Sequence, residues 1–190
     1  MFSKHSLAIC ALVLAGAGAS FSTAEIITPD PADLSDLDHG HAYLWGFELA
    51  LAPGESVAAA TLTFHNIRNW DEQPNILYCH QLDGIDLGVT VVSDGGNGGD
   101  YFETTYAGTQ APLVTYENLT TTPVELVYEF TSADLVTLNT HLADGQAGLG
   151  FDPDCHFYND GIELSLEIVP EPASCALLLL GGLTLSLRRR

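Results

Sequence analysis

The chain has 190 residues, of which 25 are Asp or Glu and only five are Lys or Arg, so its formal net charge at pH 7 is −20. A field of this sign repels phosphate backbones and anionic membrane surfaces, which excludes nucleic acid as a partner and leaves neutral sugars and divalent cations as candidates. The length suffices for one domain with a buried core, and an acidic surface also simply keeps an exported protein soluble.

The first 24 residues have the order of a secretory signal peptide. Lys4 is the one firm positive charge ahead of an apolar run over residues 7–18, and small residues follow at positions 22–24. A charged start, a short apolar stretch and a small-residue cleavage site together are typical of such a signal. We therefore predict that signal peptidase removes residues 1–24. A buried N-terminal helix is the alternative interpretation.

The next segment, residues 25–40, combines prolines with aspartates. It contains Pro29-Asp30-Pro31 and further aspartates at positions 33, 36 and 38. Proline lacks a backbone donor and Asp favours turns, so this composition disfavours a strand. We predict an acidic leader here, ahead of the folded domain.

Residues 41–169 show mainly the two-residue alternation of half-buried strands, broken by turns rich in Gly, Pro and Asp. In the first strand, residues 43–49, the side chains of Tyr43, Trp45 and Phe47 share one face, and we expect them to lie in the core. The other predicted strands cover residues 61–65, 76–82, 87–93, 113–116, 126–130, 147–151 and 162–168.

One helix is predicted near position 135. Thr131 and Asp134 resemble a capping box, and Leu135, Leu138 and Leu142 follow at helical spacing before a glycine at position 145. Many short strands with a single helix predict an all-β fold. We expect an antiparallel β-sandwich of the jelly-roll kind, with an immunoglobulin-like sandwich as the alternative.

Two cysteines fall inside the predicted exported domain, Cys79 and Cys155, while the other two lie in the predicted signal and tail. In an oxidising compartment two cysteines most simply pair with each other, so we predict a Cys79–Cys155 disulfide. A zinc site that also uses His80 and His156 is the alternative. It is disfavoured because neighbouring residues on a strand point to opposite faces.

The loop that begins at residue 152 is the best candidate for a metal site. Asp152, Asp154, Asn159 and Asp160 supply three carboxylates and an amide oxygen within nine residues. Calcium takes six to eight oxygen ligands in flexible geometry, so Ca2+ is the one cofactor that we predict. Asp and Asn are also ordinary turn residues, which is the competing explanation. A second, weaker candidate is the loop 94–100, whose four glycines make ordering costly.

A sugar contact is predicted at Trp70 and Asn69, which lie in a polar loop after a strand. An aromatic ring among hydrogen-bonding side chains suits a glycan, although a partly buried loop anchor is the competing interpretation. The neighbouring Arg68 is the sole cation of residues 25–169, and we expect it to pair with a carboxylate.

Sequence motifs for catalysis are not found in the chain. It contains neither a G-x-S-x-G nor an H-E-x-x-H pattern, and its many carboxylates make any chosen pair uninformative. We therefore predict that the protein is not an enzyme, with a secreted glycan-active enzyme using paired carboxylates as the alternative.

The last 21 residues have three parts in a fixed order: Pro170-Glu171-Pro172, an apolar stretch over residues 175–187, and Arg188-Arg189-Arg190. The apolar stretch is shorter than a comfortable membrane span, and the arginines would remain on the cytoplasmic side. This tail resembles the PEP-CTERM sorting signal, and residues 62–71 and 148–161 are similar to an exported domain that recurs in that class.

The resemblance implies processing by exosortase, after transient insertion of a C-terminal transmembrane helix into the inner membrane. It implies a final location at the cell surface or in the extracellular matrix of a bacterium that makes exopolysaccharide. We therefore predict an exported, non-enzymatic structural or glycan-binding protein that associates with exopolysaccharide.

Overall fold

The computed structural model describes residues 22–32, 34–96 and 98–170, and most of them lie in strands. The strands are β1 (Thr23–Ile27), β2 (Asp36–Leu37), β3 (His41–Glu48), β4 (Glu55–Asn69), β5 (Ile76–Leu82), β6 (Gly88–Ser93), β7 (Gln110–Glu117), β8 (Val124–Glu129), β9 (Gln146–Pro153), β10 (Phe157–Tyr158) and β11 (Ile162–Pro170). The helices are α1 (Tyr101–Thr105), α2 (Ser132–His141) and the 3-10 turn η1 (Leu142–Asp144). The predicted all-β class is confirmed.

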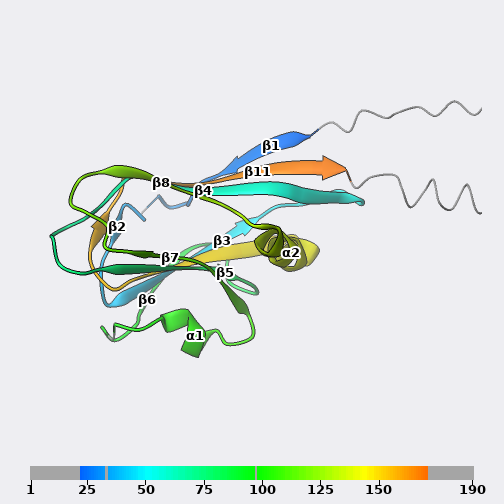
Figure 1. The fold of residues 1–190 in the computed structure, drawn as a ribbon. Helices are drawn as coiled ribbons and strands as arrows, with labels where there is room; N and C mark the ends of the chain where they lie inside the picture. The colour runs from blue at the N-terminus through cyan, green and yellow to red at the C-terminus, as the bar shows by residue number, and fades with distance from the viewer. Residues whose placement is uncertain (1–21, 33, 97, 171–190) are drawn as a thin grey trace, which may run out of the picture.

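The strands form two antiparallel sheets, which lie as two layers in Figure 1. The first has the order β1-β11-β4-β10-β2, and β8 also pairs with β4. The second has the order β6-β3-β9-β5-β7. The long strand β4 links the two ends of the first sheet, because it pairs with β11 and β8 along most of its length and with β10 at Arg68 and Asn69.

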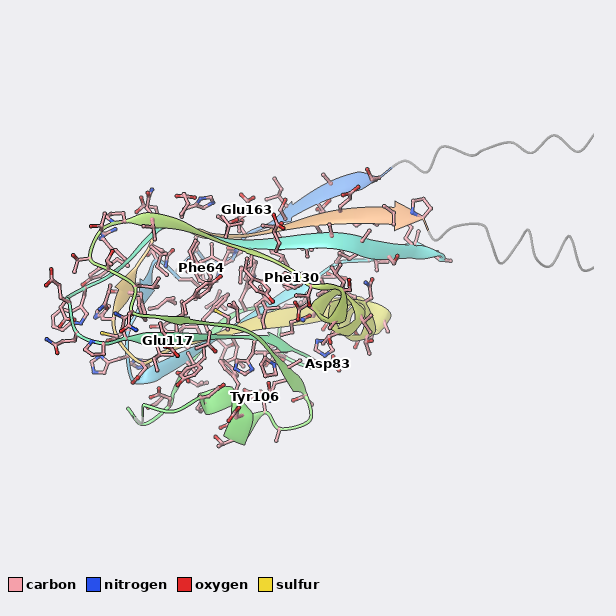
Figure 2. All side chains as sticks on the ribbon, viewed as in Figure 1. Phe64, Asp83, Tyr106, Glu117, Phe130 and Glu163 are labelled. Carbon is pink, nitrogen blue, oxygen red and sulfur yellow. The ribbon has the colours of Figure 1, made fainter. Side chains whose placement is uncertain are left out.

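The main core lies between the two sheets. The rings of Phe64 on β4 and Phe151 on β9 meet edge-on with centroids 5.3 Å apart, and Phe64 and Phe130 point into the space between the layers in Figure 2. Trp45 and Phe47 of β3 are buried in the same cluster, which confirms the prediction for that strand. Strand alternation places these side chains inward, because every second residue shares a face.

The five-stranded sheet is covered on its second face as well. The segment around α1 crosses this face (Figure 1), and Phe102 of α1 is fully buried against Ala42, Leu44 and Leu82. A Cβ atom built on Gly150 would lie 2.5 Å from Cζ of Phe102, so only glycine leaves room for the ring there. Helix α1 is a single short turn of helix and was not predicted from the sequence.

Helix α2 begins where the sequence predicts. The Thr131 hydroxyl accepts from the Asp134 backbone N–H, and the Asp134 carboxylate accepts from the Thr131 N–H at 2.7 Å, so both halves of the capping box are present. Leu138 is buried, and the Asn139 amide bonds the N–H and the C=O of Val57, each at 2.9 Å. These contacts fasten α2 to β4.

The prediction that residues 25–40 form a leader rather than strands is wrong at two places. Strand β1 pairs with β11, with Ile26 opposite Ser165, and strand β2 pairs with β10. Backbone hydrogen bonds to the open edge of a neighbouring strand require no side-chain alternation, so the sequence carries no signal for them. The predicted cleavage before Glu25 falls inside β1.

The predicted signal peptide lies almost wholly outside the described residues, and so does the predicted sorting tail after Pro170. Pro170 ends β11, opposite Glu55 of β4, whereas Glu171, Pro172 and residues 188–190 lie beyond it. Among the described residues, no helix is long and apolar enough to cross a membrane.

Candidate functional site

Three rings form an exposed group at one end of the first sheet, which we call the aromatic surface: Trp70, His156 and Tyr158. Trp70 is 58% exposed, and its ring centroid lies 6.3 Å from that of His156. The His156 and Tyr158 centroids are 4.8 Å apart, and the Arg68 guanidinium lies 5.5 Å from the centre of the Tyr158 ring. The rings thus follow one another and leave the Trp70 face in solvent.

The pairing of β10 with β4 brings these rings together. Tyr158 lies opposite Arg68, and the Trp70 N–H donates to the His156 carbonyl at 2.9 Å. Phe157 is fully buried, so its neighbours His156 and Tyr158 point outward. Because Phe157 is held in the core, His156 and Tyr158 on either side of it are presented at the surface.

Two aspartates of the predicted leader hold His156. Its Nε2 contacts Oδ1 of Asp36, and its Nδ1 lies 3.5 Å from Oδ1 of Asp38. Trp70 was predicted from the sequence as a sugar contact, but His156, Tyr158 and these aspartates were not predicted as parts of the same site. They are far apart along the chain, and only the joining of β2, β10 and β4 makes them neighbours.

Asn69 is not at this surface, which corrects its prediction as a glycan contact. Its side chain is buried, and its amide donates to the Asp71 carbonyl at 2.7 Å and accepts from the Trp70 N–H at 3.1 Å. Asn69 therefore positions the loop that carries Trp70. Arg68 lies against the Tyr158 ring and, among the described residues, forms no ion pair with a carboxylate, contrary to expectation.

A cavity of about 600 Å3, which we call the His65 pocket, opens beside this surface. Residues 28, 29, 32, 34 and 35 form one wall, and β4 with the turn between β10 and β11 forms the other. The volume lies in the range of small-molecule sites, about 300–1,000 Å3. The lining residues are Thr28, Pro29, Ala32, Leu34, Ser35, His65, Asn159, Asp160, Gly161, Ile162 and Glu163.

Two carboxylates flank the His65 ring, and a third is bonded to the next residue, Asn66. Its Nδ1 lies 2.8 Å from Oε2 of Glu125, and its Nε2 lies 3.9 Å from Oε2 of Glu163. Glu125 also accepts from the Asn66 N–H at 3.0 Å, and Asp160 accepts from the Asn66 amide at 2.9 Å. The hydrogen bond from His65, with that from the Asn66 backbone, lowers the pKa of Glu125, so this carboxyl stays ionised.

Asn66 fixes the geometry of this group. It has a φ of 50°, in the left-handed region that only Asn, Asp and Gly visit readily, at the point where the β4–β8 register shifts. The resulting bulge places His65 and Arg68 on the solvent side, while Phe64 and Ile67 are fully buried. The pocket was not predictable from the sequence, because its walls come from segments far apart in the chain.

The four predicted calcium ligands lie in two separate places, which corrects the prediction of one site. Asp152 and Asp154 border the loop that contains Asp94, whereas Asn159 and Asp160 line the His65 pocket. The Asn159 side chain is already engaged, since it donates to Leu34 O and accepts from Gly161 N. Among residues 22–32, 34–96 and 98–170, no three His, Cys, Asp or Glu side chains are arranged to hold a metal ion.

Asp152 is a buried member of β9 rather than a loop ligand. Its side chain is 2% exposed, and its Oδ2 accepts from the Tyr101 N–H of α1 at 2.8 Å. Burial, with repulsion from Asp94 and Asp100, raises its pKa to about 7. The space next to it measures about 20 Å3, which holds a water molecule but not a sugar.

A second buried polar pair also belongs to the segment around α1. His80 of β5 is buried, with its Nδ1 2.7 Å from Oε1 of Gln110 and its Nε2 2.8 Å from Oδ2 of Asp100. Asp100 in turn caps α1 by accepting from the Phe102 N–H at 3.0 Å. This pair fastens the covering segment to the sheet.

The predicted disulfide is not formed in this structure, where Cys79 and Cys155 are both free cysteines. Cys79 lies opposite Phe151 in the β5–β9 ladder, four residues before Cys155. Pro153 pairs with Leu77 and the Asp154 N–H donates to Ile76 O, so the chain after Phe151 runs away from Cys79, whereas a disulfide requires Cα atoms within about 7 Å. The strand register therefore keeps the two thiols apart. Burial raises the pKa of Cys79 well above its usual range, so it stays a thiol.

The aromatic surface leaves the face of the Trp70 ring open to solvent. Aromatic rings of this kind pack on the apolar faces of sugars. Asp36 and Asp38 beside it accept hydrogen bonds from hydroxyls. The chain matches no protein-family model, and it matches no curated protein. The assignment of this surface as the candidate site therefore rests on the arrangement of its residues alone.

Proposed function

We propose that this protein is an exported, non-enzymatic glycan-binding protein that associates with exopolysaccharide through the aromatic surface. The observation that carries the proposal is Trp70, which is 58% exposed and followed by the rings of His156 and Tyr158. A tryptophan that only anchored its loop would bury its ring. Here Asn69 and the β10–β4 pairing hold the loop, so the ring is free to act as a contact.

The charge of the chain supports a glycan ligand that is not anionic. Arg68 is the one cation among the described residues, and the Tyr158 ring covers it. Asp36, Asp38 and Asp71 accompany the rings, so an acidic polysaccharide would be repelled. Hydroxyl groups of a neutral sugar would donate to these carboxylates.

Export and sorting remain part of the proposal. They rest on the signal-like residues 1–24 and on the PEP-CTERM resemblance of residues 170–190, which implies exosortase and a place at the cell surface or in the matrix. We expect mature protein to lack Arg188-Arg189-Arg190, with cleavage near Pro170-Glu171-Pro172. An intact mass of surface material that still includes these arginines would contradict this part.

We further propose that the two sheets form a β-sandwich of the jelly-roll kind. When β1, β3, β4, β5, β7, β8, β9 and β11 are numbered 1 to 8 in chain order, the sheet orders read 1-8-3-6 and 2-7-4-5. This order is that of a jelly roll, in which two Greek keys share eight strands. Strand β6 then extends one edge, and β2 with β10 extends the end that carries the aromatic surface.

The test is affinity electrophoresis of the purified full-length chain through gels that each contain one neutral polysaccharide. We expect retardation by at least one of them, and Trp70→Ala should weaken it by tenfold or more, because stacking on the ring is lost. Val91→Ala removes an exposed apolar side chain from β6 and is the matched control. Equal retardation of Trp70→Ala and the unchanged chain would contradict the proposal.

A glycan-active enzyme is the second candidate, and the His65 pocket favours it, since Asp160 and Glu163 both line a cavity of sugar size. The carboxyl with a strongly raised pKa, Asp152, is however at the small cavity next to Asp94. Measuring reducing ends released from the retained polysaccharide separates the two. Release that Glu163→Gln abolishes would support the enzyme, and retention without release supports the binding protein.

A further inference from the structure

The His65 pocket and the aromatic surface follow one another along β4. His65 lines the pocket, and Arg68, three residues later, lies against Tyr158. Both point away from the core-facing residues Phe64 and Ile67, and the separation along the strand is about 10 Å. The chain at the end of β10 also connects the two sites, because Tyr158 belongs to the aromatic surface and Asp160, two residues later, lines the pocket. A glycan chain on the rings therefore has a path into the pocket.

The charged side chains that line the pocket beside His65 are carboxylates. Glu163 and Asp160 are carboxylates in the wall, and the lining residues include neither Lys nor Arg. In the tautomer whose Nδ1 donates to Glu125, Nε2 of His65 is a further acceptor, 3.9 Å from Glu163. A ligand group that fits between Nε2 and Glu163 must donate hydrogen bonds, and a positive charge would be favoured.

These acceptors are held in place before any ligand arrives. Glu125 bonds both the His65 ring and the Asn66 N–H, and Asp160 receives the Asn66 amide. The backbone of the bulge is tied to the turn after β10, since Asp160 N donates to His65 O at 2.7 Å and His65 N donates to Gly161 O at 2.9 Å. No hydrogen bond holds the Glu163 carboxylate among the described residues, so it remains available to a ligand.

We infer that the His65 pocket binds an amino-sugar unit with a free, protonated amine, as a subsite next to the aromatic surface. This inference rests on the proposed function and names its substrate class, a glycan that carries unacetylated amino groups. The ammonium donates to Glu163 and to Nε2 of His65, while the exposed side chain of Ala32 in the opposite wall packs on the sugar ring. An N-acetyl group would remove the positive charge on which this recognition depends.

The test compares three hexasaccharides that differ at carbon 2: glucosamine with an amine, N-acetylglucosamine with an amide, and glucose with a hydroxyl. Calorimetry with the full-length chain in 0.15 M salt measures each affinity, so that long-range attraction by the net charge is screened. We expect the glucosamine hexamer to bind roughly tenfold more tightly than the other two, which is the effect of one charge-assisted hydrogen bond.

The matched variants are Glu163→Gln and Glu167→Gln, which remove the same charge from the same outer side of β11. Glu163 lines the pocket and Glu167 does not, and Figure 2 shows Glu163 on the outer side of this sheet. We expect Glu163→Gln to reduce affinity for the glucosamine hexamer to that of the glucose hexamer. Glu167→Gln should keep the preference. Equal loss in both variants would assign the effect to overall charge and overturn the inference.

The remaining outcomes separate the inference from the proposed function. If all three hexamers bind alike and Trp70→Ala weakens all of them, the glycan-binding function stands and the amino-sugar pocket is wrong. If none binds and the polysaccharide gels also show no retardation, both fail together. Spermidine serves as an amine without a sugar: binding as tight as that of the glucosamine hexamer, and equally sensitive to Glu163→Gln, would overturn the assignment to a sugar.

Discussion

The two sheets share one core but differ on their outer faces, and this difference locates the candidate site. In β4 and β11 buried and accessible residues alternate, so one face meets the core and the other meets solvent. In β3 and β9 burial is nearly continuous, because the segment around α1 covers the second face. The aromatic surface and the His65 pocket both lie on the open sheet, where side chains can reach a ligand.

The polar side chains of the two sheets differ in the same way. On the covered sheet, His80 and Asp152 have polar partners on or next to α1, and they hold the covering segment down. On the open sheet, the carboxylates around His65 remain accessible, as their exposed fractions of 53% for Glu125 and 31% for Glu163 show. The polar residues named on the second sheet thus hold the covering segment in place, whereas the carboxylates named on the first sheet are accessible, as the proposed recognition requires. The following predictions test this distinction, from the largest expected effect to the smallest.

Phe102→Ala should destabilise the protein most. Its ring is fully buried between α1 and the five-stranded sheet, directly over Gly150, and removing it leaves a cavity that glycine cannot fill. We expect a loss of about 3–5 kcal/mol in the free energy of unfolding, measured by urea denaturation. A loss below 1 kcal/mol would mean that the covering segment is not part of the cooperative fold.

Thiol labelling should distinguish the interior of the covered sheet from its end. Cys79 is buried in β5, whereas Cys155 is half-buried after β9. In the native, unreduced chain we expect a maleimide to modify Cys155 at least a hundredfold faster, a difference of about 2.7 kcal/mol in the free energy of exposure. Peptide mapping identifies the site. Protection of both residues until a reductant is added would instead demonstrate a disulfide.

Asp152 should make the protein less stable as the pH rises. Its folded pKa is raised to about 7, so between about pH 4 and pH 7 the folded state binds a proton that the unfolded state has released. Stability therefore falls with increasing pH across this window and is constant above it. Asp152→Asn keeps an acceptor for the Tyr101 N–H without the charge, and we expect it to be roughly 2 kcal/mol more stable at pH 8.

The measurement is urea denaturation at pH 4, 6 and 8, with Asp154→Asn as the control, because Asp154 is exposed. The Asp154→Asn protein should retain the wild-type fall in stability. If Asp152→Asn still shows the wild-type fall in stability with pH, the buried Asp152 carboxyl is ionised at little cost. Burial of this side chain would then not explain the pH dependence.

Trp70→Ala should have the smallest effect on stability. The ring is mostly exposed, and the loop is held by Asn69 and by the Trp70 backbone N–H, neither of which the substitution removes. We expect a change within about 0.5 kcal/mol in the free energy of unfolding, while glycan retention weakens by tenfold or more. A loss above 2 kcal/mol would show that Trp70 anchors the fold, and its effect on retention would then have no direct interpretation.

The local elements were predictable from the sequence, because they depend on short-range patterns. The strand at residues 76–82 and the helix after Thr131 occur where alternation and a capping box placed them. Strand β1 and helix α1 were missed, since β1 depends on the edge of β11 and α1 is too short for a helical pattern. Trp70 was identified as a residue of interest from its polar loop, but the residues that complete the surface were not.

The sequence by itself determined the all-β class, the acidic charge and the core-facing aromatics of β3, because composition and alternation are local properties. The tertiary structure decided which polar residues are accessible. It buried Asp152 under α1, turned Asn69 inward, separated Cys79 from Cys155, and brought Asp36 to His156. Each of these outcomes depends on strand register and on which face of a sheet is covered. Both are fixed by contacts between residues far apart in the chain, so local patterns carry no record of them.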